Sequence, residues 1–230
     1  MLRLNLATAG ALVAVVSALI ACFAVGTATA AEFLQGEFWA ELEPFVAPEE
    51  GTGRWDRGDA AERALEFARR SFSGMVYGYN VTYRPADPDR GVERRSSVDL
   101  RGELPWGDRR LTIRDTRETE SRLFLDVRYD LDSDQARYRD GFRGASVSRA
   151  GGEGSAGIYG GPEALHDALD NAIVDAVHQH ARSRYRSRPA EIEARVLLDR
   201  PPVFGMSGGS YRVQVRAMVI LDTVRAYEVF

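Results

Sequence analysis

The sequence predicts an α+β fold in which antiparallel sheets are packed by two main helices, over about residues 60–71 and 163–187. Three observations support this prediction. Several short segments alternate apolar and polar residues, as antiparallel strands with one solvated face do. Two longer segments repeat their apolar residues every three to four positions, as amphipathic helices do. The strands also come in runs instead of alternating one by one with helices, which favours α+β over α/β.

The first 30 residues have the organisation of a signal peptide. One basic residue, Arg3, precedes an apolar run over 6–25, and the small residues of 26–30 suit the cleavage site of a signal peptidase. We therefore expect a mature chain that begins at Ala31 and is exported to a bacterial periplasm.

Two alternatives to a freely released chain stay open. Leu-Ile-Ala at 19–21 precedes Cys22, and these are the residue types that a bacterial lipoprotein signal uses, so lipidation of Cys22 would tether the protein to a membrane. About 20 apolar residues can also cross a bilayer as an uncleaved anchor. The residues after Cys22 are still apolar, where a lipoprotein usually turns polar, which favours release.

The composition agrees with export and limits the classes of partner. Cys22 is the one cysteine of the sequence, so neither disulfides nor thiolate ligands hold the mature fold. The formal net charge is −4, and all 30 basic residues are arginine. This mildly acidic balance gives no electrostatic reason to expect nucleic acid. A membrane is expected as a partner only through the lipid or an uncleaved signal.

We expect three segments along the chain. The signal peptide covers 1–30, an N-terminal segment and linker covers 31–58, and an α+β domain covers 59–230. Within that domain a helix followed by strands occurs twice, at 59–131 and 162–230, which suggests two halves without a residue-level repeat.

The N-terminal segment predicts a short helix followed by a linker. Leu34, Phe38 and Leu42 are spaced by four, and prolines at 44 and 48 limit the length of the helix. One interpretation is a helix packed on its own domain, and the other is a partner-binding element. Aromatic residues concentrate interface energy, so the candidate anchors for a partner are Phe38, Trp39 and Phe45.

Alternation and helical periodicity place the elements of the domain. Asp59 and Glu62 resemble a capping box at the start of the first helix. The alternating segments that predict strands are 75–83, 97–101, 110–114, 122–131, 192–198 and 211–221. A glycine-rich loop precedes the long helix, whose acids lie early and whose arginines lie late, as the helix dipole favours. We expect the last two strands to pair antiparallel, with Glu193 opposite Arg216.

Two glycine-containing motifs are interpreted as loops. Residues 205–209 fit the G-x-S-x-G pattern, but a strand follows Ser207 and no histidine comes later in the chain, so a hairpin loop is expected instead of a nucleophile elbow. Residues 152–157 fit G-x-G-x-x-G, but four residues separate the last glycine from Pro162, where the helix is expected to start. No cofactor is therefore expected, and the alternative for this motif is a simple anion bound at the helix N-terminus.

The acidic run at 130–134 is the one candidate metal site. Asp130, Asp132 and Asp134 alternate, and oxygen clusters of this kind bind Ca²⁺, although Gln135 and Gly141 stand where an EF-hand needs glycine and glutamate. The alternative is a solvated strand end. His178 and His180 project about 200° apart on a helix, so one metal ion cannot take both. His166 and Asp170 are four positions apart and could share an ion, but the sequence places no further ligand beside them, so a surface pair is expected.

These observations predict an exported cell-envelope protein that is a non-catalytic module binding another envelope protein or envelope component. The competing hypothesis is an enzyme or small-ligand-binding protein whose site is assembled from scattered acidic residues, which leave no linear trace. A pocket with convergent carboxylates would favour the second hypothesis, and an exposed apolar patch would favour the first.

The signal-peptide interpretation predicts the mass of the mature protein. Intact-mass measurement on envelope fractions should give the mass of a chain that starts at Ala31, because the small-residue tract ends at Ala30. A mass that corresponds to a lipidated chain starting at Cys22 would contradict this prediction. In that case Cys22→Ala should release the protein from membranes.

Overall fold

The computed structural model describes residues 32–43, 57–144, 147–161, 163–185 and 188–227. The predicted signal peptide, Cys22 and Phe45 lie outside these ranges. Residues 32–230 form one compact unit, and its fold is α+β with antiparallel sheets, as the sequence predicts. Among the residues described, no helix is both long enough and apolar enough to span a membrane.

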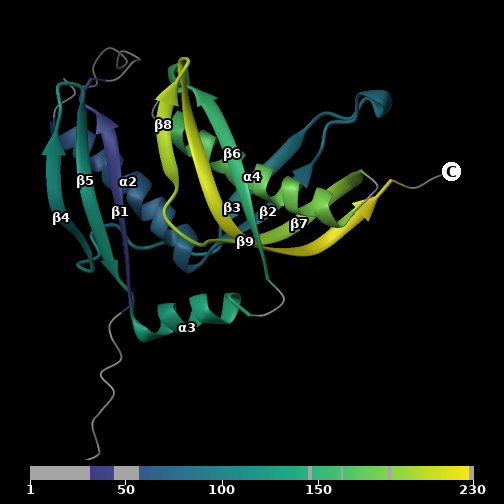
Figure 1. The fold of residues 1–230 in the computed structure, drawn as a ribbon, viewed down its shortest axis with the longest axis horizontal. Coiled ribbons are helices and arrows are strands. Elements are labelled where there is room, and N and C mark those ends of the chain that lie inside the picture. Colours follow the sequence, from purple (N-terminus) through teal and green to yellow (C-terminus); the bar gives the residue numbers. More distant parts are fainter. Residues whose placement is uncertain (1–31, 44–56, 145–146, 162, 186–187, 228–230) are drawn as a thin grey trace, which may run out of the picture. The chain divides into compact units, whose positions relative to one another are not determined.

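A three-stranded antiparallel sheet stands at one side of this unit (Figure 1). Its order is β1-β5-β4, with β1 at Phe33–Glu41, β5 at Arg122–Asp130 and β4 at Leu111–Glu118. The alternation predicted for β5 is confirmed. Its buried residues are Leu123, Leu125, Val127 and Tyr129.

The structure corrects the helix predicted for the N-terminal segment, because β1 is a strand paired with β5. The residues of β1 that face the core are Leu34, Gly36, Phe38 and Ala40. A spacing of four fits a strand of period two as well as a helix, so Leu34 and Phe38 do not separate the two. Gly36 takes the place of an apolar residue on the core face, so the alternation of apolar and polar residues along β1 is not visible in the sequence. A Cβ there would lie 3.1 Å from the side chains of Phe38 and Pro201, so the position admits no bulky apolar residue.

A six-stranded antiparallel sheet forms the larger layer. Its order is β3-β2-β7-β9-β6, and β8 pairs with the first part of β9. The strands are β2 (Tyr79–Arg84), β3 (Arg95–Leu100), β6 (Ser148–Gly157), β7 (Pro189–Leu198), β8 (Val203–Ser207) and β9 (Ser210–Ala226). β2, from the predicted first half, pairs with β7, from the predicted second half. The two halves therefore share one sheet.

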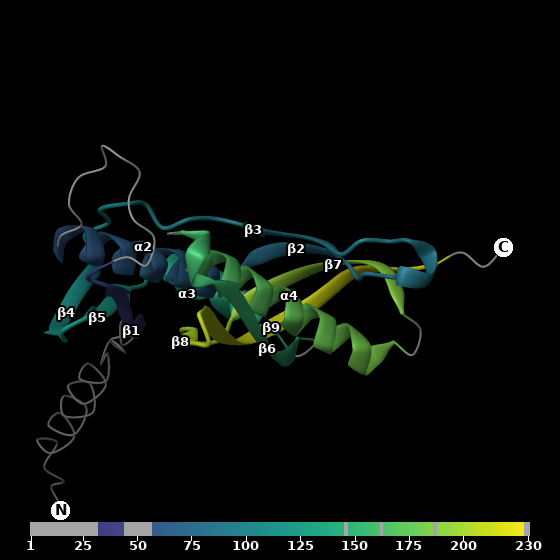
Figure 2. The same ribbon diagram turned by 90° about the horizontal axis from the view of Figure 1, so that it is seen from above.

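Three α-helices and two short 3-10 helices complete the described part of the chain. They are α2 (Arg57–Val76), α3 (Ser133–Phe142), α4 (Ala164–Arg184), η1 (Pro88–Arg90) and η2 (Ile158–Gly160). α2 lies over the three-stranded sheet, whereas α4 lies along β6 and β9 (Figure 2). The Phe38 ring on β1 meets Phe67 and Phe72 of α2 edge-on, at 6.1 and 5.4 Å. An ion pair of 2.8 Å between Arg70 and Asp170 joins α2 to α4.

The boundaries of the two predicted helices differ in their accuracy. α4 agrees closely with its prediction. α2 begins two residues before Asp59, which therefore lies in the first turn instead of capping the helix, and it continues through Met75, which we had placed in a strand. The predicted strand at 75–83 is consequently shorter and begins at Tyr79.

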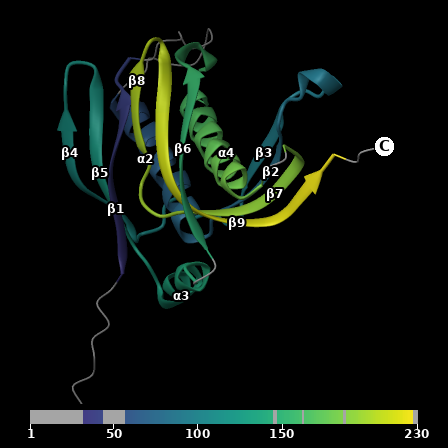
Figure 3. The ribbon, with the colours of Figure 1, turned by 45° about the vertical axis from the view of Figure 1, so that its right-hand side comes forward.

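The last strands pair antiparallel as predicted, but in another register. Glu193 lies opposite Thr223, and Arg225 bonds to Glu191 and Glu193 at 3.1 and 3.4 Å, so the predicted pairing of Glu193 with Arg216 is wrong. The cause is the length of β9. The first part of β9 pairs with β8, an element that the sequence reading missed, and β7 therefore pairs with the later part (Figure 3).

The glycine-rich stretch predicted as a loop is strand β6, and its glycines allow a close contact with α4. A Cβ on Gly154 would lie 2.2 Å from the carbonyl oxygen of Ala168 and 2.2 Å from the nitrogen of Ala172. A Cβ on Gly152 would lie 2.1 Å from the Ala172 oxygen and 2.5 Å from the Ala176 nitrogen. Glycine in a strand often marks such an approach of another backbone, so α4 packs directly on the main chain of β6.

Side chains of α4 also cover the free edge of β6, which among the described strands pairs with β9 alone. The Asp175 carboxylate accepts a hydrogen bond from the Glu153 backbone nitrogen at 3.0 Å. The Asn171 amide donates to the Ser155 carbonyl at 3.2 Å. Unpaired backbone groups of an edge strand would otherwise be open to pairing with another chain, so these two side chains close the sheet.

Gly154→Ala should destabilise the fold strongly. Because the new methyl group would overlap backbone atoms of α4, helix and strand must separate, and we expect a loss of about 3 kcal/mol in the free energy of unfolding measured with urea. Gly151→Ala is the matched control on the same strand, since its Cβ would meet only the Val215 oxygen, at 3.8 Å. Equal effects from the two substitutions would show that the close contact does not limit the packing.

Asp175→Ala should cost about 1 kcal/mol of unfolding free energy, because it removes the acceptor for the Glu153 N–H at a partly exposed edge. Asp175→Asn keeps an acceptor oxygen in place and should recover most of that stability. Urea unfolding of the two variants side by side measures the difference. If the Asn variant is as unstable as the Ala variant, the carboxylate acts through its charge and not through this bond.

Candidate functional site

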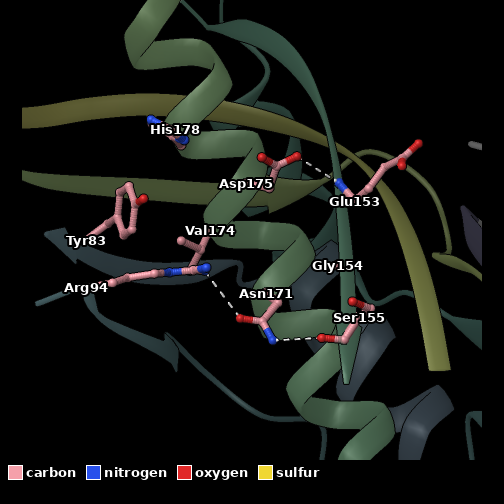
Figure 4. A pocket seen from close by; sticks show the side chains of 9 residues that line it. All are labelled: Tyr83, Arg94, Glu153, Gly154, Ser155, Asn171, Val174, Asp175 and His178. Atoms are coloured by element: carbon pink, nitrogen blue, oxygen red, sulfur yellow. Dashed lines mark hydrogen bonds between the residues drawn. The ribbon is translucent and has the colours of Figure 1, made fainter. Parts of the chain in front are cut away.

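A polar pocket of about 250 Å³ lies beside the edge of β6 covered by α4 (Figure 4). Three parts of the chain build it. α4 contributes side chains from successive turns, β6 contributes its edge, and β2 with the residue preceding β3 forms the opposite wall. The lining residues are Tyr83, Arg94, Glu153, Gly154, Ser155, Asn171, Val174, Asp175 and His178.

The helical spacing of α4 explains why its polar residues meet here. Asn171, Asp175 and His178 are four and three positions apart, so they project from one face of the helix. Two of them bond to the edge of β6, as described above. Gln179 donates a further hydrogen bond to Asp175 at 3.4 Å. The pocket is therefore built on the same contacts that close the sheet.

The opposite wall is formed by Tyr83 and Arg94. The Tyr83 ring meets the His178 ring at 5.4 Å with an interplanar angle of 60°, and the Arg94 guanidinium lies 5.7 Å from the centre of the Tyr83 ring. Arg94 also donates to the side-chain oxygen of Asn171 at 3.4 Å. These contacts bring the strand β2 and the start of β3 against α4.

The environment of His178 favours a neutral imidazole at neutral pH, mainly through burial. Burial lowers the pKa of His178, and the positive charge of Arg182 lowers it further. Asp175 raises the pKa, whereas Arg94 and Arg188 lower it. A neutral imidazole can accept one hydrogen bond and donate another, and it gains a charge only below its pKa.

The acidic side of the pocket is already engaged. Asp175 bonds to the Glu153 backbone and to Gln179. The Glu153 carboxylate points away from the other lining side chains and accepts a bond from Gln214 at 3.0 Å (Figure 4). The two carboxylates of the pocket therefore do not converge on a common point.

The calcium candidates are used in other ways. Asp132 is the N-cap of α3, where its carboxylate accepts from the backbone nitrogens of Asp134 and Gln135, and it pairs with Arg110 at 2.6 Å. Asp130 pairs with Arg128, and Asp134 with Arg137. Over the described ranges, no three acidic, histidine or cysteine side chains are grouped as a metal site requires. The run at 130–134 thus ends a strand and starts a helix.

Two of the three candidate partner anchors are buried, which favours packing of this segment on its own domain over a partner-binding element. Phe38 and Trp39 are 0% and 6% exposed. The Trp39 ring stacks on Phe204 of β8 at 5.0 Å, and Arg122 covers it at 4.2 Å. These side chains hold β1 within the fold and are not available as surface anchors. The third candidate, Phe45, lies outside the described residues.

The three histidines and Ser207, which are the remaining candidate site residues, do not come together in one site. His166 contacts the Phe67 ring, His178 lines the pocket, and His180 is 8% exposed on α4. Ser207 ends β8 in a hairpin with β9, as predicted, and the turn residues Gly208 and Gly209 have φ values of 60° and 71°. No histidine is in hydrogen-bond contact with Ser207 in the part of the chain described.

Sequence reasoning missed the pocket as a unit. Tyr83, Arg94 and Asn171 come from distant segments, and no spacing pattern connects them. The one available signal was the pair Asn171 and Asp175, four residues apart on a face of a helix beside a glycine-rich strand. Polar side chains at such a boundary indicate bonds to a strand edge.

The relatives of this chain give no function. An uncharacterized protein of Treponema pallidum (strain Nichols) is 22% identical over 192 residues, which are 84% of this chain and 81% of that protein. No solved structure matches significantly. The model of a protein family of unknown function matches residues 22–227, which is nearly the whole sequence. The chain belongs to this family.

Proposed function

We propose that the protein is an exported bacterial cell-envelope protein that acts by non-catalytic binding, and that the pocket between α4, β6 and β2 is its ligand site. Export rests on the signal-like opening of the sequence. The binding role rests on the geometry of the pocket, whose directional polar groups surround a space that is not filled by the chain itself.

The observation that carries the proposal is the way in which the acidic groups of the pocket are used. Catalysis by scattered carboxylates needs at least one acid or base aimed at the substrate with a pKa suited to proton transfer. Asp175 instead holds the edge of β6, and Glu153 turns toward Gln214. This use of the two carboxylates supports binding by the remaining polar surface over catalysis at this pocket.

The size and lining of the pocket favour a small polar ligand over a protein partner. Drug-sized ligands occupy pockets of about 300–1,000 Å³, so 250 Å³ suits a smaller molecule. The lining combines an aromatic ring, Tyr83, with hydrogen-bonding groups of Arg94, Asn171 and His178. We therefore specify the expected envelope component as a small molecule and not as another protein.

Native mass spectrometry of protein purified from the envelope of its own host tests this function. The wild type should carry a non-covalent mass that is released unchanged on denaturation. His178→Trp should lose this mass, because the larger ring fills the pocket beside Tyr83. Val203→Trp, at a 58% exposed position on β8 that does not line the pocket, is the control and should retain it.

Two results would contradict the proposal. A bound mass that persists in His178→Trp would place the ligand elsewhere, and the absence of any bound mass in the wild type would remove the support for a ligand. The released molecule should also be incubated with the wild type in large molar excess. If the protein converts the released molecule into a different compound, it is a catalyst, and the proposal of non-catalytic binding is wrong.

A further inference from the structure

The pocket side chain with the most unused hydrogen-bond donors is a cation, the Arg94 guanidinium. A guanidinium carries five N–H donors, and Arg94 uses one of them in a long bond of 3.4 Å to Asn171. Within the described ranges no carboxylate lies at ion-pair distance from Arg94, whose side chain is exposed at the mouth of the pocket. The nearby acid, Asp175, is already bonded to two donors.

Most of the charged groups around His178 are also positive. The groups whose charges act on this imidazole are Arg182 and Asp175 of α4, Arg94 before β3, and Arg188 before β7. Three of the four are positive. The rings of Tyr83 and His178 meet at 5.4 Å and Arg94 lines the pocket beside them, so this end of the pocket presents a positive group (Figure 4).

The volume of the whole pocket limits the size of the ligand. At about 30 Å³ for each water-sized group, 250 Å³ accommodates about eight such groups. An oxyanion fills only part of this space. The remainder is bordered by Val174, the Tyr83 ring and the Asn171 amide, which suit a short polar body.

We propose that the pocket binds a small molecule through a carboxylate or phosphate group, which pairs with the Arg94 guanidinium and lies beside His178. Arginine is suited to this role because its planar fork can hold two oxygens of either group at once. The inference rests on the proposed function in that it names the ligand class of the same pocket. Its test does not require the natural ligand.

Binding of an oxyanion should be coupled to protonation of His178. Burial and the arginines keep this imidazole neutral, so it contributes no charge at neutral pH. A bound anion favours the charged form and raises the pKa of His178. By reciprocity, the affinity for the anion rises as the pH falls through that pKa.

Sulfate and acetate are the probes, titrated at constant ionic strength with chloride as the balancing anion. The chain has three histidines, so their imidazole NMR signals can be assigned with single substitutions. Sulfate represents the tetrahedral oxyanion and keeps its charge throughout the titration, and acetate represents the planar one. At least one probe should raise the pKa of His178 and leave His166 and His180 unchanged.

Arg94→Gln should weaken binding of that probe about tenfold, as expected for the loss of a charged hydrogen-bond pair. Arg95→Gln is the matched control, because Arg95 is the next residue, is exposed and has the same charge. Equal losses in the two variants, a response to neither probe, or equal responses of all three histidines would overturn the proposal.

The two proposals fail separately. If the ligand recovered by native mass spectrometry is uncharged or cationic and is still lost in His178→Trp, the binding function stands and the oxyanion inference is wrong. If a probe binds through Arg94 but the native protein carries no ligand, the oxyanion site stands and the envelope-ligand function is wrong.

Discussion

The direct contact between α4 and the backbone of β6 determines most of what surrounds it. Gly152 and Gly154 have no side chains to hold the helix away, and alanines of α4 face them. Helix and strand therefore approach until main-chain atoms meet. At this distance the short side chains of Asn171 and Asp175 reach the edge of β6. A longer separation would leave that edge unpaired and the pocket without one of its walls.

This contact explains why a cluster of polar residues beside a pocket is not by itself a catalytic constellation. Asn171 and Asp175 are needed to satisfy backbone groups that the end of the sheet leaves free. What remains open to a ligand is Arg94 on the opposite wall and the His178 ring on α4, which make weaker contacts with the rest of the chain. The proposed binding role thus falls on other groups than those that close the sheet.

The elements with the most regular pattern of apolar residues were the ones that the sequence predicted correctly. β5 alternates over its whole length and α4 carries a long apolar stripe, so both were predicted. β6 was missed because its glycines, which are rare in strands, are required by the helix that packs on it. α3 was missed although Asp132 and Gln135 have the spacing of a capping box, because the aspartates had been weighed as metal ligands.

The site was less predictable than the fold for a physical reason. The backbone of a helix or a strand is periodic, so each of these elements leaves a periodic pattern of apolar residues in the sequence. A pocket leaves no such pattern, because it depends on which segments the topology brings together. Arg94 reaches Asn171 only because β2 pairs with β7, which places the start of β3 across from α4. Seventy-seven positions separate the two residues in sequence. A positive residue at that place has no local cause, and only the folded chain shows that it has no acidic partner among the described residues.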